Sequence, residues 1–379
     1  MIKVFVPIDD AACSVGANEV AQELETQAKA RNIEIELIRN GSRGMLWLEP
    51  LVEVEIENKR YGFANIDETK VKELFDTNFL TDKSHKLSIG EVENHEWLKN
   101  QTRVTFQRVG VIDPVNIKDY EAHGGLVGLK NALKLSDSQI VAEVTESGLR
   151  GRGGAGFPAG IKWKTVLNTA SDQKYVCCNA DEGDSGTFAD RMLMEGDPFT
   201  LIEGMTIAAI AVGATKGFIY IRSEYPQAIK TMNKAIIEAN KFGLLGKNIL
   251  GSNKEFQIEV RSGAGSYVCG EETAMLESLE GKRGVVRAKP PLPAIEGLFG
   301  KPTIINNVLT LASVPMVLAK GANFYKSLGT EKSKGTQVFQ LAGNIKHGGI
   351  FETSFGISLN ELINKFGGGT LTCLLYTSD

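Results

Sequence analysis

The sequence is poor in the features that tie a chain to a membrane, an oxidising compartment or nucleic acid. Its five cysteines among 379 residues are too few for a disulfide framework, and their odd number suits a reducing compartment. The longest apolar runs, 206–214 and 308–319, fall short of the roughly 18 residues that span a bilayer. The start, MIKVFVPIDD, lacks a signal-peptide pattern, and the formal net charge of −4 favours neither nucleic acid nor an anionic membrane. We therefore expect a cytoplasmic protein that binds no nucleic acid and does not insert into membranes.

The composition is that of a globular protein, with 42% hydrophobic and 23% charged residues, and the length suits about two or three domains. Residues 1–100 show the order strand, helix, strand, then strand, strand, helix. β-rich runs indicate the strands, and apolar residues at helical spacing indicate the helices, the last of them capped near Asp67. In chain order these elements are 2–7, 14–32, 33–38, 51–57, 60–66 and 68–79.

Residues 101–130 are interpreted as a linker because DPVN and HGG breaks interrupt any periodicity. From 131 to about 330, helical and buried-strand patterns alternate, which favours an α/β layered sandwich with a largely parallel sheet. The strands are expected at 174–180, 216–223 and 256–262, and two of the helices at 198–214 and 225–243. Residues 335–379 begin another β-rich unit followed by a helix, which the last ten residues, TLTCLLYTSD, leave incomplete.

The strongest local signal is a glycine-rich loop, GLRGRGGAGFPAGIKW, at residues 148–163. The G-x-G-x-x-G pattern of dinucleotide-binding Rossmann folds is matched there by Gly151, Gly153 and Gly156. That fingerprint requires a strand before the loop, whereas the preceding residues have helical spacing behind a cap at Ser136 or Asp137. The ordinary dinucleotide interpretation is therefore disfavoured.

Two interpretations of this loop remain, a plain flexible connection and an anion cradle. Consecutive glycines let backbone N–H groups approach an anion closely. Arg150, Arg152 and Lys162 bring positive charge to the same loop. We predict a cradle for a phosphate or a flavin.

An acidic segment follows the expected strand at 174–180, where α/β sheets bind ligands. Its polar residues are Asn179, Asp181, Glu182 and Asp184. A solvated acidic turn is the ordinary alternative. A metal site is disfavoured because no histidine is near and the carboxylate spacing does not fit an EF-hand loop.

Two later segments complete the set. A second glycine loop leads into a helix with Glu271 and Glu272 in its first turn, where the helix dipole favours acidic residues and simple capping is the alternative. Cys269 beside them is interpreted as a small buried hydrophobe. Further on, Asn306 and Asn307 offer amides suited to the edge of a heterocycle, or else belong to a structural turn. The order of all four segments is far more specific than any one of them.

The strings RGRGGAGFPAGIKW, NADEGDSGTF, GAGSYVCGEET and GKPTIINNVLTLASVP together resemble the FMN- and NADH-binding flavoprotein subunit of respiratory complex I. That family includes the diaphorase subunits of NAD-reducing hydrogenases and the beta subunits of NAD-dependent formate dehydrogenases. The resemblance covers roughly residues 130–370. The variants FPAGIKWKTV, NADEGDSGTFADRM and KPPLPA, with the N-terminal domain, are most similar to the formate dehydrogenase beta subunit.

The resemblance implies a thioredoxin-like domain over 1–100, a Rossmann-like FMN- and NAD-binding α/β domain over 131–330, and the start of a β-grasp (ubiquitin-like) domain over 335–379. It implies FMN contacts at Gly151, Arg152, Gly153, Gly154, Gly156, Lys162, Asn179, Asp181, Tyr267, Gly270, Glu271, Asn306 and Asn307. It implies NAD(H) contacts at Phe157, Glu182, Asp184, Glu272 and Lys289. No catalytic residue is expected, because hydride passes directly between the nicotinamide and flavin rings.

This sequence departs from the family in three ways. Complex I members have aromatic residues where Thr165 and Leu292 stand here, so stacking on the nucleotide is less aromatic. The N-terminal domain resembles a thioredoxin-like [2Fe-2S] subunit, but Ser42 and Leu46 stand where that family has cysteines, so with Cys13 alone it should bind no cluster and serve docking. The family's C-x-x-C-x-x-C run and fourth cysteine are also missing.

Cys373, in TLTCLLYTSD, does not match the family's cluster cysteines, so the sequence is expected to be truncated or chimeric near residue 370. We therefore expect this chain to lack the [4Fe-4S] helical domain of the intact family and its metal ligands.

The function expected from the resemblance is FMN-dependent hydride transfer with NAD(H), in a formate dehydrogenase with a [2Fe-2S] thioredoxin-like gamma subunit and a molybdenum- and iron–sulfur-containing alpha subunit. A hydrogenase or complex I diaphorase subunit is the alternative within the class. A non-catalytic docking or scaffold fragment is the alternative outside it.

Overall fold

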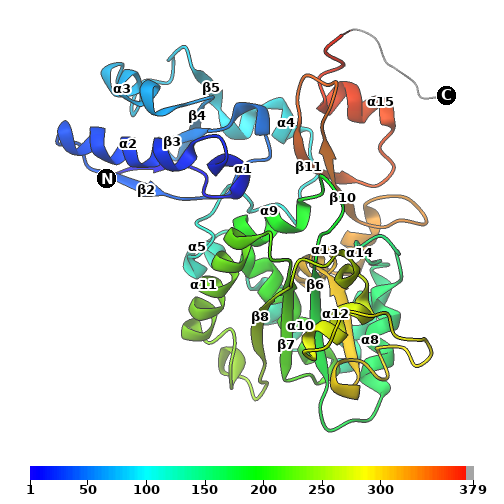
Figure 1. Cartoon of the computed structure of the whole chain (residues 1–379). Coiled ribbons are helices and arrows are strands. Elements are labelled where there is room, and N and C mark those ends of the chain that lie inside the picture. Colours follow the sequence, from blue (N-terminus) through cyan, green and yellow to red (C-terminus); the bar gives the residue numbers. More distant parts are fainter. Residues whose placement is uncertain (373–379) are drawn as a thin grey trace. The chain divides into compact units, whose positions relative to one another are not determined.

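The computed structural model describes residues 1–372, which form two compact units (Figure 1). The first unit contains residues 1–103 and 107–113 together with residues 338–372. The second contains residues 104–106 and 114–337. Among the described residues, no helix has both the length and the apolar character needed to cross a membrane.

The N-terminal part of the first unit is a mixed sheet with the strand order β2-β1-β3-β4-β5. Strand β1 (Ile2–Phe5) pairs in parallel with β2 (Ile35–Ile38) and antiparallel with β3 (Val52–Ile56), while β4 (Lys59–Phe63) and β5 (Ser88–Glu91) continue the sheet antiparallel. The main helices are α2 (Ala17–Ala30) and α3 (Glu68–Asp76). This is the expected βαβ–ββα order of a thioredoxin-like domain, with β5 as an addition that the sequence pattern did not predict.

The expected cap of α3 is confirmed, because the Asp67 carboxylate accepts hydrogen bonds from the N–H groups of Thr69 and Lys70. Ser42 lies fully buried, and its hydroxyl donates to Glu49 at 2.5 Å. Leu46 begins a short 3₁₀ helix, η1 (Leu46–Leu48). Cluster-binding relatives are expected to have cysteines at these two positions. Here Ser42 belongs to the packed interior of the domain, and Leu46 belongs to a short helical turn.

The β-rich segment expected after residue 335 lies in the same unit from Val338 onward. Strands β10 (Thr336–Leu341) and β11 (Gly349–Ser354) form a two-stranded sheet, and α15 (Leu359–Glu361) continues into a π-helical turn, η6 (Leu362–Phe366). Phe351 and Phe366 stack with ring centroids 3.8 Å apart, and Trp97 packs edge-on against both rings. Cys373, to which the sequence assigned no cluster, lies outside the described residues.

The second unit is built on a parallel sheet of order β8-β7-β6-β9. The strands are β6 (Tyr175–Ala180), β7 (Lys216–Ile221), β8 (Gln257–Ser262) and β9 (Thr303–Asn307), and every neighbouring pair is parallel. This confirms the predicted parallel α/β architecture. The first three strands come from the apolar runs expected to form strands, whereas β9 was not predicted.

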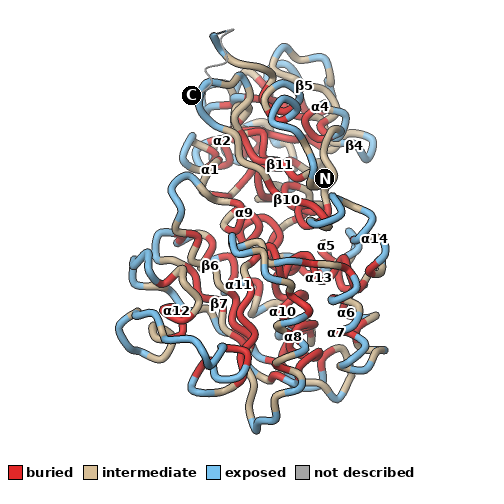
Figure 2. Tube along the Cα trace, turned by 90° about the vertical axis from the view of Figure 1, so that its right-hand side faces the viewer, coloured by how far each residue is buried: buried red, intermediate tan, exposed pale blue. Residues whose placement is uncertain are grey.

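Helices pack around this sheet. They are α7 (Asp137–Glu146), α8 (Ala159–Asn168), α9 (Ala189–Gly196), α10 (Pro198–Val212), α11 (Pro226–Phe242), α12 (Glu272–Leu279), α13 (Val308–Lys320) and α14 (Ala322–Ser327). The sequence predicts those that begin at Asp137, Pro198, Pro226 and Glu272, but not those that begin at Ala159, Ala189, Val308 and Ala322. Every residue of α10 is buried, as are the residues of α13 up to Leu318, and Figure 2 shows both helices in the interior of this unit. Such helices are apolar all round because they have no solvent face.

Residues 101–130, expected to be a linker, are largely folded into the second unit. They hold two short helices, α5 (Ile117–Ala122) and α6 (Val127–Ala132), and residues from 114 onward belong to the second unit. The buried carboxylate of Glu203 accepts the Tyr120 hydroxyl at 2.5 Å and the N–H groups of Leu126 and Leu129 at 2.9 Å. A long-range buried hydrogen-bond network therefore orders a segment whose helices are too short to show periodicity.

Gly160 allows α7 and α8 to pack closely, and its substitution tests that packing. A Cβ atom at residue 160 would lie 2.2 Å from Oγ1 and 2.6 Å from Cα of Thr145. We expect Gly160→Ala to lower the free energy of unfolding by about 1–3 kcal/mol, measured by denaturant titration. Lys164→Ala on the exposed side of the same helix is the control, with an expected change within about 0.5 kcal/mol. Equal effects of the two variants would contradict the close approach.

Candidate functional site

The register of the parallel sheet brings the polar ends of two strands together. In the β6–β9 pair, Asn179 lies opposite Asn307, and Cys178 lies opposite Asn306. These three asparagines stand at the carboxyl edge, where open α/β sheets bind ligands. Segments that are almost 130 residues apart in the sequence thus contribute amides to one edge.

The glycine loop lies between α7 and α8, so the predicted helix before it is confirmed. The N-terminus of α7 is closed by a capping box of Ser136 and Gln139. The loop closes on itself through hydrogen bonds from Gly151 N to Phe157 O at 2.8 Å and from Ala159 N to Leu149 O at 2.9 Å. This helix–loop–helix context is not that of a Rossmann fingerprint.

The tip of the loop presents free backbone donors beside the end of β9. Within the described chain, the N–H groups of Gly153, Gly154 and Gly156 have no hydrogen-bond partner. Gly154 and Gly156 have φ values of +101° and +61°, which glycine adopts without strain. A Cβ on Gly153 would come within 3.2 Å of the Asn307 Cβ. The loop and the start of α13 therefore enclose a narrow cradle of backbone donors.

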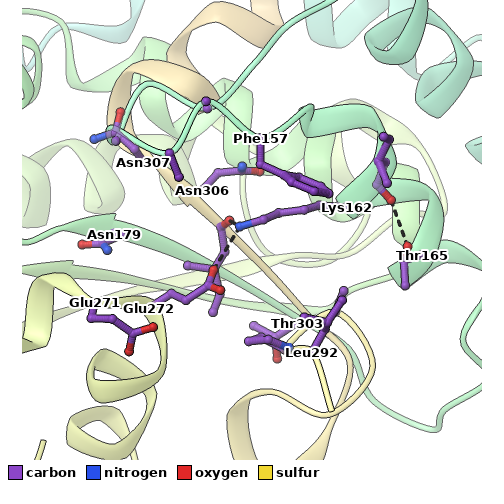
Figure 3. A pocket seen from close by; sticks show the side chains of 18 of the residues that line it. Phe157, Lys162, Thr165, Asn179, Glu271, Glu272, Leu292, Thr303, Asn306 and Asn307 are labelled. Atoms are coloured by element: carbon purple, nitrogen blue, oxygen red, sulfur yellow. Dashed lines mark hydrogen bonds and ion pairs between the residues drawn. The ribbon is translucent and has the colours of Figure 1, made fainter. Parts of the chain in front are cut away.

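A cavity of about 520 Å³ opens between the loop and the sheet edge (Figure 3), a size typical of cofactor sites. Twelve of the expected cofactor residues line it: Gly151, Gly153, Gly156, Phe157, Lys162, Asn179, Gly270, Glu271, Glu272, Lys289, Asn306 and Asn307. Thr165 and Leu292, the two departures from the aromatic pattern, also line it. Four segments expected to act together thus meet at one cavity.

A chain of alternating charges crosses this cavity. The Lys162 ammonium contacts Glu272 at 3.0 Å and the Ile305 carbonyl oxygen at 3.1 Å. The Lys289 ammonium lies 2.8 Å from Glu272 and 3.0 Å from Glu271. Burial alone raises the pKa of Glu272, but the two lysines outweigh burial and leave it below its usual value. Both carboxylates are therefore held in their charged forms.

The amides at the sheet edge are fixed by neighbours. Asn306 accepts a hydrogen bond from the indole N–H of Trp163 at 2.9 Å. Asn307 caps α13 by accepting from Leu309 N, and its amide donates to the buried Asp190 at 2.6 Å. Asn179 donates to the Gly270 carbonyl at 2.8 Å. Such fixed partners determine which polar groups face the cavity.

Six expected residues do not line the cavity. The Arg152 guanidinium donates to the hydroxyl of Tyr325 and the carbonyl of Lys334, and so supports the loop from behind. Asp184 accepts the hydroxyl of Tyr267 at 2.7 Å. The others are Gly154, Asp181 and Glu182. Partial burial raises the pKa of Asp181 to about 6, against the opposing effect of Arg222.

Glu182 is 8% exposed and serves the start of α9. Its carboxylate accepts the N–H groups of Asp190 and Arg191 at 3.1 and 3.2 Å, and the Tyr225 hydroxyl at 3.2 Å. Burial raises the pKa of Glu182 despite these hydrogen bonds. Glu182 therefore fixes the backbone at the start of α9 and does not line the cavity.

Six further residues line the cavity that the sequence did not single out. These residues are Ala155, Ile161, Pro293, Ala294, Thr303 and Ile305. Ile305 and Thr303 belong to the unpredicted strand β9, so recognising that strand was the signal that would have found them. Among the described residues, no group of three or more His, Cys, Asp and Glu side chains is arranged to hold a metal ion.

Comparisons with known proteins agree with this geometry. Residues 144–316 match the family described as the Nuo51 FMN-binding domain. The NADP-reducing hydrogenase subunit HndC of Solidesulfovibrio fructosivorans is 52% identical over 271 residues, 72% of this chain and 55% of the relative. A subunit of an NADH-quinone oxidoreductase of Rhizobium meliloti is 49% identical, over 71% of this chain and 64% of the relative.

A solved structure covers nearly all of the chain. It is an NAD⁺-reducing [NiFe]-hydrogenase in its air-oxidised state, at 26% identity and a TM-score of 0.59, spanning 96% of this chain and 60% of the other. The present chain thus spans only about 55–64% of the length of these relatives. FMN and NAD(H) are the cofactors of the family that these matches identify. The chain belongs to the family of flavoprotein subunits of complex I and related hydrogenases, with its FMN-binding domain at residues 144–316.

Proposed function

We propose that this chain holds FMN in the cavity at the carboxyl edge of its parallel sheet and transfers hydride between NAD(H) and that flavin. The carrying observation is the convergence on one cavity of the glycine loop, the asparagines of β6 and β9, and the paired lysines. The relatives, named as subunits of NADH-quinone oxidoreductases and a hydrogenase, support this proposal.

The residues fit the phosphate of FMN. The helix α13 has 13 residues and begins at the cavity, so its N-terminal dipole favours an anion there. The free N–H groups of Gly153, Gly154 and Gly156 are nearby donors of the kind that bind phosphate. A Cβ on Gly153 would crowd Asn307 at 3.2 Å, so glycine leaves the most room for an anion there.

The remaining polar groups suit the flavin ring and ribityl chain. Lys162 offers positive charge, and Asn179 and Asn306 offer amides around the cavity wall. Arg152 supports the loop. Gly270 lines the cavity, and Asp181 and Tyr267 are near in sequence to the lining residues Asn179 and Gly270. When bound, FMN supplies a ring that accepts hydride from reduced nicotinamide, so no protein acid or base is required.

The chain's own contribution is to hold two rings together and to keep water away from them. Phe157, Ile161 and Leu292 line the cavity yet are 46%, 50% and 50% exposed. Apolar side chains exposed in one cavity favour a flat, apolar ligand face such as a nucleotide base. Lys289 and Glu272 offer polar contacts beside that wall, and we place NAD(H) there.

We further propose that the chain works in a multi-subunit iron–sulfur enzyme in a reducing compartment such as the cytoplasm. Formate as the electron source, with gamma and alpha subunits as partners, rests on the sequence resemblance alone. The hydrogenase alternative is favoured by the 52% identity to HndC and by the near-complete coverage from an NAD⁺-reducing hydrogenase. A molybdenum-subunit gene beside this one would favour formate, and a hydrogenase-subunit gene would favour hydrogen.

A reconstitution assay separates the enzyme from a docking fragment. The purified chain is loaded with FMN, freed of excess flavin and assayed for NADH-dependent reduction of ferricyanide. The proposal expects stoichiometric flavin and turnover that stops when NADH is omitted. A folded sample that binds no flavin would favour the docking alternative.

Lys162→Ala tests the flavin site. Loss of a cation beside the cofactor is expected to raise the Kd for FMN by roughly tenfold or more, measured by flavin fluorescence titration. Glu272 keeps Lys289 as a partner, so the variant leaves no isolated carboxylate. The control is Lys164→Ala, an exposed lysine on the same helix. If Lys164→Ala weakens FMN as much as Lys162→Ala, Lys162 is not a flavin contact.

Leu292→Phe tests the nucleotide wall. A ring at this position adds stacking worth about 0.5–1.5 kcal/mol, so KM for NADH should fall by roughly 2- to 10-fold with kcat nearly unchanged. Ile295→Phe is the control, since Ile295 is 48% exposed nearby but does not line the cavity. A KM that is unchanged by Leu292→Phe, or equally lowered by the control, would place the base elsewhere.

A further inference from the structure

One wall of the cavity is a short segment with little packing of its own. Residues 288–296, here called the strap, carry Lys289, Leu292, Pro293 and Ala294 into the cavity lining. Residues 288–292 are all exposed, and only Pro293 and Ala294 of the strap are buried. No hydrophobic core therefore holds Lys289 and Leu292 in place.

Behind the strap lies a second, polar space of about 300 Å³. Its lining includes the carboxylates Glu277, Glu280 and Glu296 and the cations Lys282 and Arg287. Pro293 lines both this space and the main cavity. The strap is thus a thin partition between two solvent-accessible spaces. Its buried part is held by a hydrogen bond from Thr303 N to the Pro293 carbonyl at 3.0 Å, whereas its exposed residues depend on polar contacts elsewhere.

Arg287 supplies polar contacts at both ends of the strap. Its backbone N–H donates to the Thr273 hydroxyl at 2.9 Å, and its Nη1 donates to the Gly297 carbonyl at 3.0 Å. One residue directly before the strap is therefore bonded to the residue directly after it. A loop whose ends are joined in this way loses much of its conformational freedom.

The same guanidinium is anchored on α12. Its Nε lies 2.5 Å from Glu277 and its Nη2 lies 2.8 Å from Glu280. Thr273, Glu277 and Glu280 are spaced to lie on one side of the helix. The N-terminal end of α12 also carries Glu271 and Glu272, the partners of Lys289. The helix and the strap are consequently joined at two places, by Arg287 at the base and by Lys289 in the cavity.

We infer that Arg287 is a positioning residue for nucleotide binding: it fixes the strap to α12 so that Lys289 and Leu292 face the proposed NAD(H) position. This inference rests on the proposed function for the identity of the ligand. Arg287 itself does not line the main cavity and acts through the two strap residues. The planar guanidinium suits this task, because it reaches two carboxylates and a carbonyl at once and a lysine does not.

The test compares Arg287→Ala and Arg287→Lys with Lys282→Ala in the full chain. Lys282 also pairs with Glu280 at 2.8 Å, but its ion pairs among the described residues are with Glu277 and Glu280 and not with the strap, so it controls for loss of a cation. We expect Arg287→Ala to raise KM for NADH by roughly tenfold or more, with kcat within about twofold and FMN affinity unchanged. Arg287→Lys should recover only part of this loss, and Lys282→Ala should resemble the parent chain.

Hydrogen exchange of the flavin-free protein gives a readout that does not depend on activity. In Arg287→Ala, amides within 288–297 should exchange faster while those of β6 and β9 keep their protection. Unchanged strap exchange and unchanged KM would overturn the inference, as would an equal loss of FMN affinity. If Arg287→Ala does not fold, Arg287→Lys decides by the same criteria. A parent chain that binds neither FMN nor NADH would defeat the proposed function, and the exchange comparison would still decide whether Arg287 fixes the strap.

Discussion

The parallel pairing of β6 with β9 is the constraint on which the candidate site depends. It sets Asn179 beside Asn307 and directs both strand ends to the edge where the glycine loop folds over the sheet. Helix α13 starts immediately after β9, so the same pairing aims its positive end at the cavity. Without this register, the amides, the helix terminus and the loop donors would not converge.

Electrostatic pairing is the second organising feature. Lys162 and Lys289 both contact Glu272, and Lys289 also contacts Glu271, which caps α12 through the N–H groups of Thr273 and Ala274. An anion bound near Lys162 would compete with Glu272, which would still pair with Lys289. Lys162 could therefore leave Glu272 for a ligand without leaving that carboxylate unpaired. An unpaired carboxylate would be costly in a partly buried site. The strap carrying Lys289 is therefore as much part of the site as the sheet edge.

Local patterns predicted those parts of the fold that local forces determine. Apolar residues at helical spacing, behind a cap at Ser136 or Asp137, predicted the helix before the glycine loop, and this helix disfavoured a Rossmann fingerprint. The apolar runs gave β6, β7 and β8. Strand β9 was missed because it has only five residues and ends in two asparagines, so its place in the sheet comes from tertiary pairing. The prediction of a linker at 101–130 was wrong for a similar reason. The buried Glu203, far away in the sequence, holds α5 and α6 through hydrogen bonds.

For the site, the sequence identified the segments more reliably than the direction of each side chain. Most of the expected residues line the cavity, whereas Glu182 turns to the backbone of α9 and Arg152 turns to Tyr325. Such directions depend on partners far away in the chain, which no local pattern encodes. The charge chain through Glu272 and the contacts of Arg287 depend on tertiary structure in the same way.

An experimental structure of the chain loaded with FMN tests the central claim most directly. The account predicts density for the flavin in the cavity between the glycine loop and the carboxyl edge of β6 and β9, with its phosphate near Gly153 and the start of α13. Flavin bound at any other place, with that cavity empty, would contradict it.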